Sequence, residues 1–283
     1  MKQRFITGLL IGLIVVPLLL LGNIPYLIGI LLLLGGTAYE LSNIKKHNWV
    51  IKIITILLVT LPTLYNYFHL ENGVTDIPIL LIFLPIFIYY TIAVWNEKFD
   101  FNSATFLSLF TIIMILFGKS ALYIRSINNN ANALAFVLLT TCSVDIFALL
   151  SGKFFGKHKL NERISPKKTI EGAVGGALCA LIFALTFNLF FPIFSNNNTT
   201  NFLNLGFSSS LKLVEPLKVL LIALTLTIAG QLGDLFFSMV KRHYQIKDFS
   251  NLLPGHGGLT DRIDSVCVNF IIFSILFVFL LTL

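Results

Sequence analysis

Residues 216–240 read PLKVLLIALTLTIAGQLGDLFFSMV, and runs of this kind decide the fold class. After Lys218 the only charge in the run is Asp234, and roughly 20 apolar residues in a helix cross the core of a bilayer. Hydrophobic residues make up 56% of the chain and charged residues 12%, with a mean hydropathy of +0.88. Soluble domains usually contain about 25% charged residues. The sequence therefore predicts an all-α, polytopic integral membrane protein.

Nine runs have the length of a transmembrane helix. They cover residues 5–22, 25–43, 49–67, 77–95, 104–124, 132–151, 170–194, 216–240 and 264–283. The first follows Lys2 and Arg4, as in a signal peptide, but no small-x-small cleavage site comes after it. We therefore expect a retained first helix.

The distribution of Lys and Arg predicts the orientation of these helices. If the N-terminus is cytoplasmic, most of the 20 basic residues fall in cytoplasmic segments, as the positive-inside rule requires. The C-terminus is then outside, and Asn-rich segments such as 195–200 face away from the cytoplasm. The formal charge of +7 is explained in this way, and we expect no nucleic acid partner. Cys142, Cys179 and Cys267 lack the spacing of a zinc site.

Polar residues concentrate in the second half of the chain, around the predicted cytoplasmic loops 152–169 and 241–263. We therefore predict that residues 1–130 form a transmembrane scaffold and that residues 131–283 form the catalytic region. In the scaffold, Glu40 and Lys119 lie inside predicted spans. They could form a structural pair or a gate.

The end of the 241–263 loop has the pattern of a phosphate and metal site. Residues 254–258 read PGHGG, and such small residues let backbone amides approach a phosphate closely. Asp261 and Asp264 follow with a spacing of three, which places both carboxylates on one helix face. Mg²⁺ typically takes one or two carboxylates together with substrate phosphates. His256 lies in the turn without a second His or Cys at metal-ligand spacing.

Two further acids lie inside predicted spans. Asp234, Ser238 and Lys241 are spaced by four and three residues and share one helix face. Asp145 lies about two turns from the end of its own span. Carboxylates in such positions usually line a cavity or pair with a cation, because exposure to lipid is costly.

The 152–169 loop ends with Ser165-Pro166-Lys167-Lys168-Thr169, just before a predicted helix. Helix N-termini favour anions, so Ser165, Lys167, Lys168 and Thr169 are candidate phosphate ligands. The alternative is that this basic loop only sets the topology. The glycines that follow, at 172, 175 and 176, indicate close helix packing.

The stretch from Ser238 to Asp264 resembles the signature of the phosphatidate cytidylyltransferases, also called CDP-diacylglycerol synthases. It fits the pattern S-x2-K-R-x4-K-D-x-S-x2-L-P-x-H-G-G-L-x-D-R-I-D at every fixed position. Residues 165–172 resemble the S-P-K-K-T-x-E-G element of that family, so the likeness covers about residues 140–283. Leu149 and Ile170 depart from the aromatic residues that are common there.

The resemblance implies that phosphatidic acid and CTP react to give CDP-diacylglycerol and pyrophosphate. It implies Mg²⁺, with a second cation such as K⁺, and a homodimer. The lack of a cleavable presequence and the style of the loops favour a bacterial inner membrane. Because CTP is soluble in the cytoplasm and the lipid headgroup lies at the membrane surface, we expect the active site to face the cytoplasm. The implied metal ligands are Asp234 and Asp261, with Asp264 and Asp145 as further ligands. The implied catalytic and substrate-binding residues are Lys241, Arg262, His256, Ser165, Lys167, Lys168, Thr169, Ser238, Arg242, Lys247, Asp248, Gly257 and Gly258.

Two other functions fit parts of the pattern. A CTP-dependent lipid kinase would transfer the γ-phosphate to a polyprenol or a similar alcohol, so its product would lack cytidine. A transporter also places acids within the membrane, but the sequence lacks the paired repeats of many transporters.

Overall fold

The computed structural model describes residues 12–13, 15–19, 21–68, 79–127, 131–193, 214–253, 255 and 257–281. Several predicted features lie outside these residues. They are half of the first span, the Asn-rich segment 195–200, Pro254 and His256.

Helices dominate the part of the chain that the structure describes. Their bounds are α2 Asn23–Asn43, α3 Trp49–Phe68, α4 Ile79–Trp95, α5 Phe101–Ser126, α6 Asn132–Phe155, α7 Ile170–Phe190, α8 Val214–His243 and α9 Thr260–Leu281. Seven of them are long and apolar enough to cross a membrane, whereas the apolar part of α4, Leu80–Trp95, is shorter. The prediction of an all-α, multi-pass membrane protein is confirmed at this level. The direction in which the helices cross the membrane stays a prediction.

The helices that carry the predicted site are longer than their hydropathy indicated. Helix α8 continues to His243 rather than ending at residue 240, and α9 begins at Thr260 rather than at residue 264. A run of apolar residues ends at the first charged residue, but the helix itself can continue. Lys and Arg are tolerated in its last turn, and Asp in its first turn. As a result, Lys241 and Arg242 are helical, and Asp261 lies in the first turn of α9.

A small β-hairpin, which the sequence did not predict, precedes α7. Strand β1 (Lys159–Asn161) pairs antiparallel with β2 (Ser165–Thr169), with Lys159 opposite Thr169. Thr169 also caps α7, because its hydroxyl oxygen accepts a hydrogen bond from the Gly172 N–H at 3.1 Å. The helix start at residue 170 is therefore confirmed, and the lysine loop is a strand.

The chain folds into two compact units. Unit 1 contains residues 1–123 and 243–263, and unit 2 contains residues 124–242 and 264–283. The chain passes from the first to the second between Ile263 and Asp264, within α9. The predicted functional division between residues 1–130 and 131–283 stays a prediction.

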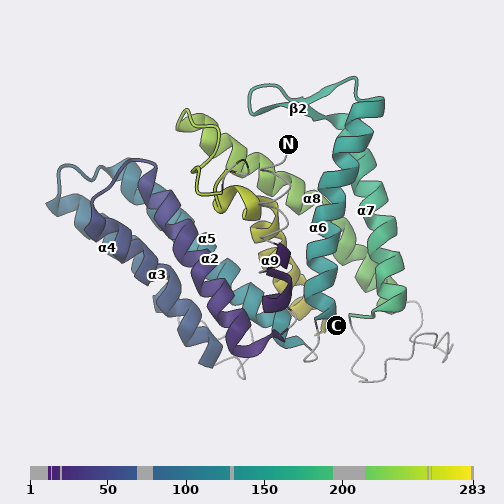
Figure 1. Ribbon diagram of the computed structural model, residues 1–283, viewed down its shortest axis with the longest axis horizontal. Coiled ribbons are helices and arrows are strands. Elements are labelled where there is room, and N and C mark those ends of the chain that lie inside the picture. The colour runs from purple at the N-terminus through teal and green to yellow at the C-terminus, as the bar shows by residue number, and fades with distance from the viewer. Residues whose placement is uncertain are drawn as a thin grey trace. The chain divides into compact units, whose positions relative to one another are not determined.

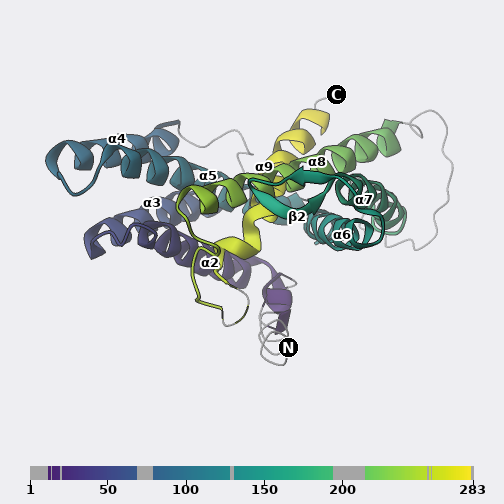
Figure 2. The ribbon, with the colours of Figure 1, turned by 90° about the horizontal axis from the view of Figure 1, so that it is seen from above.

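Helices α2 and α3 lie side by side in unit 1, and α6 and α7 do so in unit 2 (Figures 1 and 2). Glycines allow α6 and α7 to pack closely against each other. A Cβ atom built on Gly176 would lie 2.7 Å from the Cβ of Ala148, so only glycine fits there without a shift. The glycines after residue 170 thus serve helix packing, as expected.

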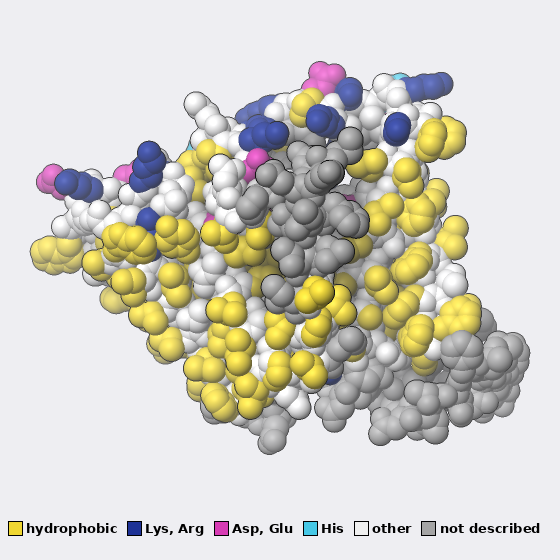
Figure 3. All heavy atoms as spheres, viewed as in Figure 1, with side chains coloured by type: hydrophobic (Ala, Val, Ile, Leu, Met, Phe, Trp, Pro, Cys, Tyr) yellow, Lys and Arg dark blue, Asp and Glu magenta, His cyan; other side chains and the backbone are white. Residues whose placement is uncertain are grey.

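The surface of unit 2 has an apolar and a basic part. Exposed apolar side chains cover the outer faces of α6 and α7, among them Leu139, Ile146, Leu178 and Ile182. Lys and Arg side chains gather at the end of these helices that carries the β-hairpin (Figure 3). This is the pattern of helices that lie in lipid and end at a polar interface.

Candidate functional site

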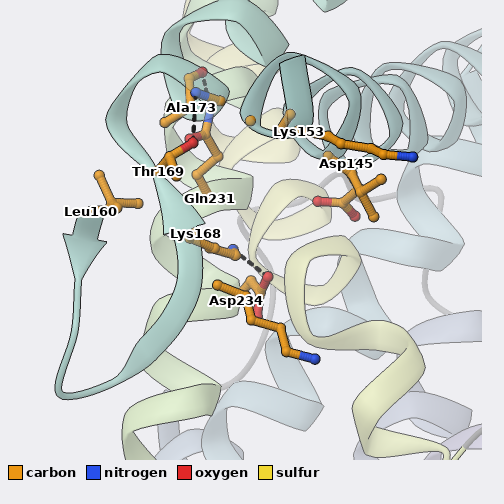
Figure 4. A pocket seen from close by; sticks show the side chains of 13 residues that line it. Asp145, Lys153, Leu160, Lys168, Thr169, Ala173, Gln231 and Asp234 are labelled. Carbon is orange, nitrogen blue, oxygen red and sulfur yellow. Dashed lines mark hydrogen bonds and ion pairs between the residues drawn. The ribbon is translucent and has the colours of Figure 1, made fainter. Parts of the chain in front are cut away.

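A cavity of about 530 Å³ lies in unit 2, between α6, α7, α8 and the β-hairpin (Figure 4). Its wall is apolar with a few charged groups. The lining residues are Asp145, Ala148, Leu149, Gly152, Lys153, Leu160, Lys167, Lys168, Thr169, Gly172, Ala173, Gln231 and Asp234. The cavity therefore brings Asp145 and Asp234 together with the lysine loop.

An ion pair joins the hairpin to α8 at this cavity. Lys168 Nζ contacts Asp234 Oδ2, and both side chains are largely buried, with 30% and 25% of their surface exposed. The second oxygen, Asp234 Oδ1, accepts a hydrogen bond from the Ser238 hydroxyl at 3.2 Å. Successive side chains of a strand point to opposite faces, so Lys168 points inward while its neighbour Lys167 is exposed. Strand geometry thus selects which lysine meets the carboxylate.

Two further carboxylates of unit 2 interact electrostatically with Asp234. Asp145 comes from α6, and Ser265 hydrogen-bonds to it. Asp264 comes from α9, interacts with Lys241, and accepts a hydrogen bond from the Ser265 N–H at 2.8 Å. Three carboxylates from three helices therefore face two lysines, Lys168 and Lys241. By formal charge, the three carboxylates outnumber the two lysines by one.

The chemistry of this cluster fits a hard divalent cation. Carboxylate and hydroxyl oxygens are the ligands that Mg²⁺ prefers, and the ion usually completes its coordination shell with substrate phosphates and water. Among the residues that the structure describes, no three His, Cys, Asp or Glu side chains form a ready-made ligand group. The residues therefore fit a cation that one or two carboxylates hold together with a bound phosphate. The metal assignment stays a prediction.

Asp261 organises the glycine turn within unit 1. Its Oδ2 accepts hydrogen bonds from the Phe249 N–H at 2.8 Å and the Gly258 N–H at 3.0 Å. Gly257 has a φ of 81°, a conformation that other residues rarely adopt, and a Cβ there would lie 3.2 Å from the same oxygen. Glycine is therefore required at this position. The turn is as tight as its sequence predicted.

The remaining predicted residues have different environments. Lys247, Asp248 and Arg262 are exposed in unit 1. Arg242 belongs to unit 2, where its Nε donates to the Ile164 carbonyl at 3.4 Å, and Ser165 is half-buried there. His256 lies outside the described residues, so its assignment stays a prediction.

Sequence reasoning missed Gln231 and Lys153, which also line the cavity. Gln231 Nε2 donates to the Ala173 carbonyl of α7 at 3.2 Å and to the Thr227 carbonyl at 3.1 Å. A signal was present, because Gln231 precedes Asp234 by three residues in an apolar run and so shares its helix face.

Comparison with known protein families matches residues 2–280 to the cytidylyltransferase family. The chain belongs to this family. The cytidylyltransferase likeness thus extends over the N-terminal half, beyond the residues 140–283 that the motifs indicated. The expected membership is confirmed.

Curated cytidylyltransferases match over nearly their full length. The phosphatidate cytidylyltransferase of Bacillus subtilis (strain 168) is 32% identical over 271 residues, which cover 94% of this chain and 93% of the relative. The phosphatidate cytidylyltransferase of Staphylococcus saprophyticus is 31% identical over 271 residues, 94% of each chain. The protein of that name from Staphylococcus aureus (strain COL) has the same identity and coverage.

Proposed function

We propose that this chain is a phosphatidate cytidylyltransferase, which transfers CMP from CTP to phosphatidic acid in phospholipid biosynthesis. The observation that carries the proposal is the cavity of unit 2, where acids from membrane-spanning helices meet a lysine of the hairpin. The similarity to full-length relatives of that name supports it. Such a site suits a reaction between a phospholipid and a polyphosphate.

The reaction itself needs positioning and charge neutralisation. An oxygen of the lipid phosphate attacks the α-phosphorus of CTP, and the bond from that phosphorus to the oxygen bridging to the β-phosphate breaks. Pyrophosphate leaves with the electron pair, and a new P–O–P linkage forms CDP-diacylglycerol. In-line transfers of this kind depend on holding the two reactants together and on neutralising their charges.

The described residues divide these tasks. When a phosphate enters the cavity, Lys168 exchanges its contact with Asp234 for the phosphate oxygens, and Lys241 adds positive charge within unit 2. Ser165, Lys167 and Thr169 bind phosphate at the hairpin. In unit 1 the Gly257 amide, with Lys247 and Arg262, binds phosphate oxygens in the same way, while the Gly258 amide holds Asp261 in place.

In unit 2 we assign Asp234 as a ligand of Mg²⁺, with Asp264 and Asp145 as further ligands, and in unit 1 we assign Asp261; K⁺ is the second cation. When bound, the metal neutralises the triphosphate. The enzyme works as a homodimer in the bacterial inner membrane, with its active site facing the cytoplasm. The apolar wall of the cavity, including Ala148 and Leu149, suits a substrate whose acyl chains remain in the membrane.

The test uses the purified protein in detergent with phosphatidic acid, Mg²⁺ and CTP labelled with ³²P at the α-phosphate. We expect the label to enter the lipid fraction as CDP-diacylglycerol and to stay out of it when EDTA is present. A parallel reaction contains CTP labelled at the γ-phosphate, and a polyprenol as the acceptor. Transfer of the γ-label to the polyprenol instead would identify a lipid kinase and overturn the proposal. Transfer of neither label would contradict both enzyme assignments.

A further inference from the structure

Glu40 of α2 is a buried carboxylate that the site described above does not use. Only 1% of its surface is exposed, and it lies in unit 1 together with residues 243–263. Its oxygen Oε1 accepts hydrogen bonds from the Ser250 hydroxyl at 2.5 Å and the Leu259 N–H at 2.8 Å. Its other oxygen, Oε2, accepts from the Thr260 N–H at 2.9 Å and the Thr260 hydroxyl at 2.8 Å. Four donors from one loop therefore converge on a single side chain 210 to 220 residues away.

These donors explain why position 40 carries an acid. The first N–H groups of a helix have no partner within that helix, and a negative charge at this end is favoured by the helix dipole. A side chain just before the helix normally caps it. For α9 the acceptor comes from α2, through Glu40. Glutamine could not replace it, because its NH₂ group would face the backbone N–H of Leu259 or of Thr260, which can only donate.

The same loop is held from a second side by Asp261. Phe249 and Gly258 donate backbone hydrogen bonds to Asp261, while Ser250 and Leu259, their neighbours in the chain, donate to Glu40. A Cβ atom built on Gly258 would lie 2.8 Å from both carboxylate oxygens of Glu40. The loop is therefore in direct contact with two carboxylates, those of Glu40 and Asp261.

We propose that Glu40 is a positioning residue of the transferase, which acts through residues 249–260. By holding Leu259 and Thr260 it fixes the start of α9, and with it the direction of the Asp261 carboxylate and of the glycine-turn amides. The proposal rests on the function proposed above, since it assigns the turn to phosphate binding. It gives α2, in the predicted scaffold, an indirect part in substrate binding, through the glycine turn.

The test compares Glu40→Gln with the wild type and with Thr37→Val. Thr37 is a matched control, because it is buried in the same helix and its hydroxyl bonds to the Leu34 carbonyl of that helix and to Met114 Sδ of α5. Initial rates are measured against CTP concentration. We expect kcat/KM of Glu40→Gln to fall by roughly tenfold to a hundredfold, with a clear rise in KM for CTP, because the phosphate ligands are displaced. A defect of folding alone would reduce the amount of active enzyme and leave KM unchanged.

Amide hydrogen exchange gives a readout without turnover. We expect the peptide containing Leu259 and Thr260 to exchange faster in Glu40→Gln than in the wild type, and Thr37→Val to leave it protected. Wild-type KM and wild-type exchange in Glu40→Gln would overturn the proposal. If that variant does not fold, Ser250→Ala replaces it, since it removes one of the four hydrogen bonds; a raised KM supports the proposal and an unchanged KM overturns it. A wild type that transfers no α-label would instead contradict the function proposed above.

Discussion

Asp234 holds two donors at once, the Lys168 ammonium from the hairpin and the Ser238 hydroxyl from its own helix. Removing one partner of a largely buried ion pair leaves the charge of the other partner without compensation. The free energy lost in this way exceeds the stabilisation that the intact pair provides. The side chain that we propose as a metal ligand is therefore also one whose loss disturbs its neighbours. Conservative substitutions are the right probes at this scale.

We expect Asp234→Asn to remove turnover while the protein still inserts and elutes as the wild type does. Asparagine keeps the size and one acceptor oxygen, but it lacks the charge for a cation. The measurement is transfer of the α-label, with elution in detergent as the check on folding. Lys46→Ala is the control, since Lys46 is exposed and outside the cluster. Normal activity in Asp234→Asn would contradict the metal assignment.

Asp261→Asn separates charge from hydrogen bonding in the glycine turn. The amide oxygen can still accept from Phe249 and Gly258, so we expect the fold to survive. Turnover should be abolished, because the negative charge that would bind the cation is gone. Rates measured over a range of Mg²⁺ concentrations check this expectation. A wild-type Mg²⁺ dependence would remove Asp261 from the ligand set.

Among the secondary structure elements, the pair α6 and α7 with the β-hairpin forms most of the cavity wall. The two helices approach closely because glycines of α7 face small residues of α6. A Cβ atom built on Gly172 would lie 2.7 Å from the Ala148 carbonyl oxygen and 2.8 Å from Thr169 Oγ1. The first contact involves backbone, which cannot rotate away.

Gly172→Ala should therefore destabilise unit 2 and reduce activity together. Overpacking of this kind costs about 1–3 kcal/mol. Thermal unfolding in detergent measures the loss of stability, and transfer of the α-label measures the loss of activity. Gly35→Ala is the matched control, because a Cβ there would meet only Ile56 Cγ2 at 3.9 Å, an ordinary contact. Equal melting temperatures for both variants would show that α7 can move away from α6.

At the scale of the whole molecule, hydropathy and charge predict the orientation in the membrane. Lys157, beside the hairpin, should face the cytoplasm, and residue 198 should face the opposite side. Single cysteines introduced by Lys157→Cys and Asn198→Cys in a variant without the three native cysteines test this. A membrane-impermeant thiol reagent added to intact cells should label only the second. Labelling of only the first would invert the topology.

The sequence predicted the membrane class, the helix runs and the lysine and glycine elements, because each depends on a pattern of nearby residues. It did not predict the β-hairpin, whose pairing depends on a few hydrogen bonds within a polar loop. Nor could it predict the role of Glu40, which binds residues about 220 positions away. A single acidic residue in an apolar run indicates that its carboxylate has a partner, but which residue that partner is depends on the tertiary structure.

The ion pair between Lys168 and Asp234 also has a consequence for substrate selection. Each charge of this pair is compensated by the other, so a ligand must bring its own negative charge to take the lysine. Phosphatidic acid has that charge, whereas diacylglycerol, with the same acyl chains, has none. Diacylglycerol in excess should therefore leave the rate of label transfer unchanged, and strong competition would argue against this filter. The ion pair would thus discriminate between two lipids by headgroup charge.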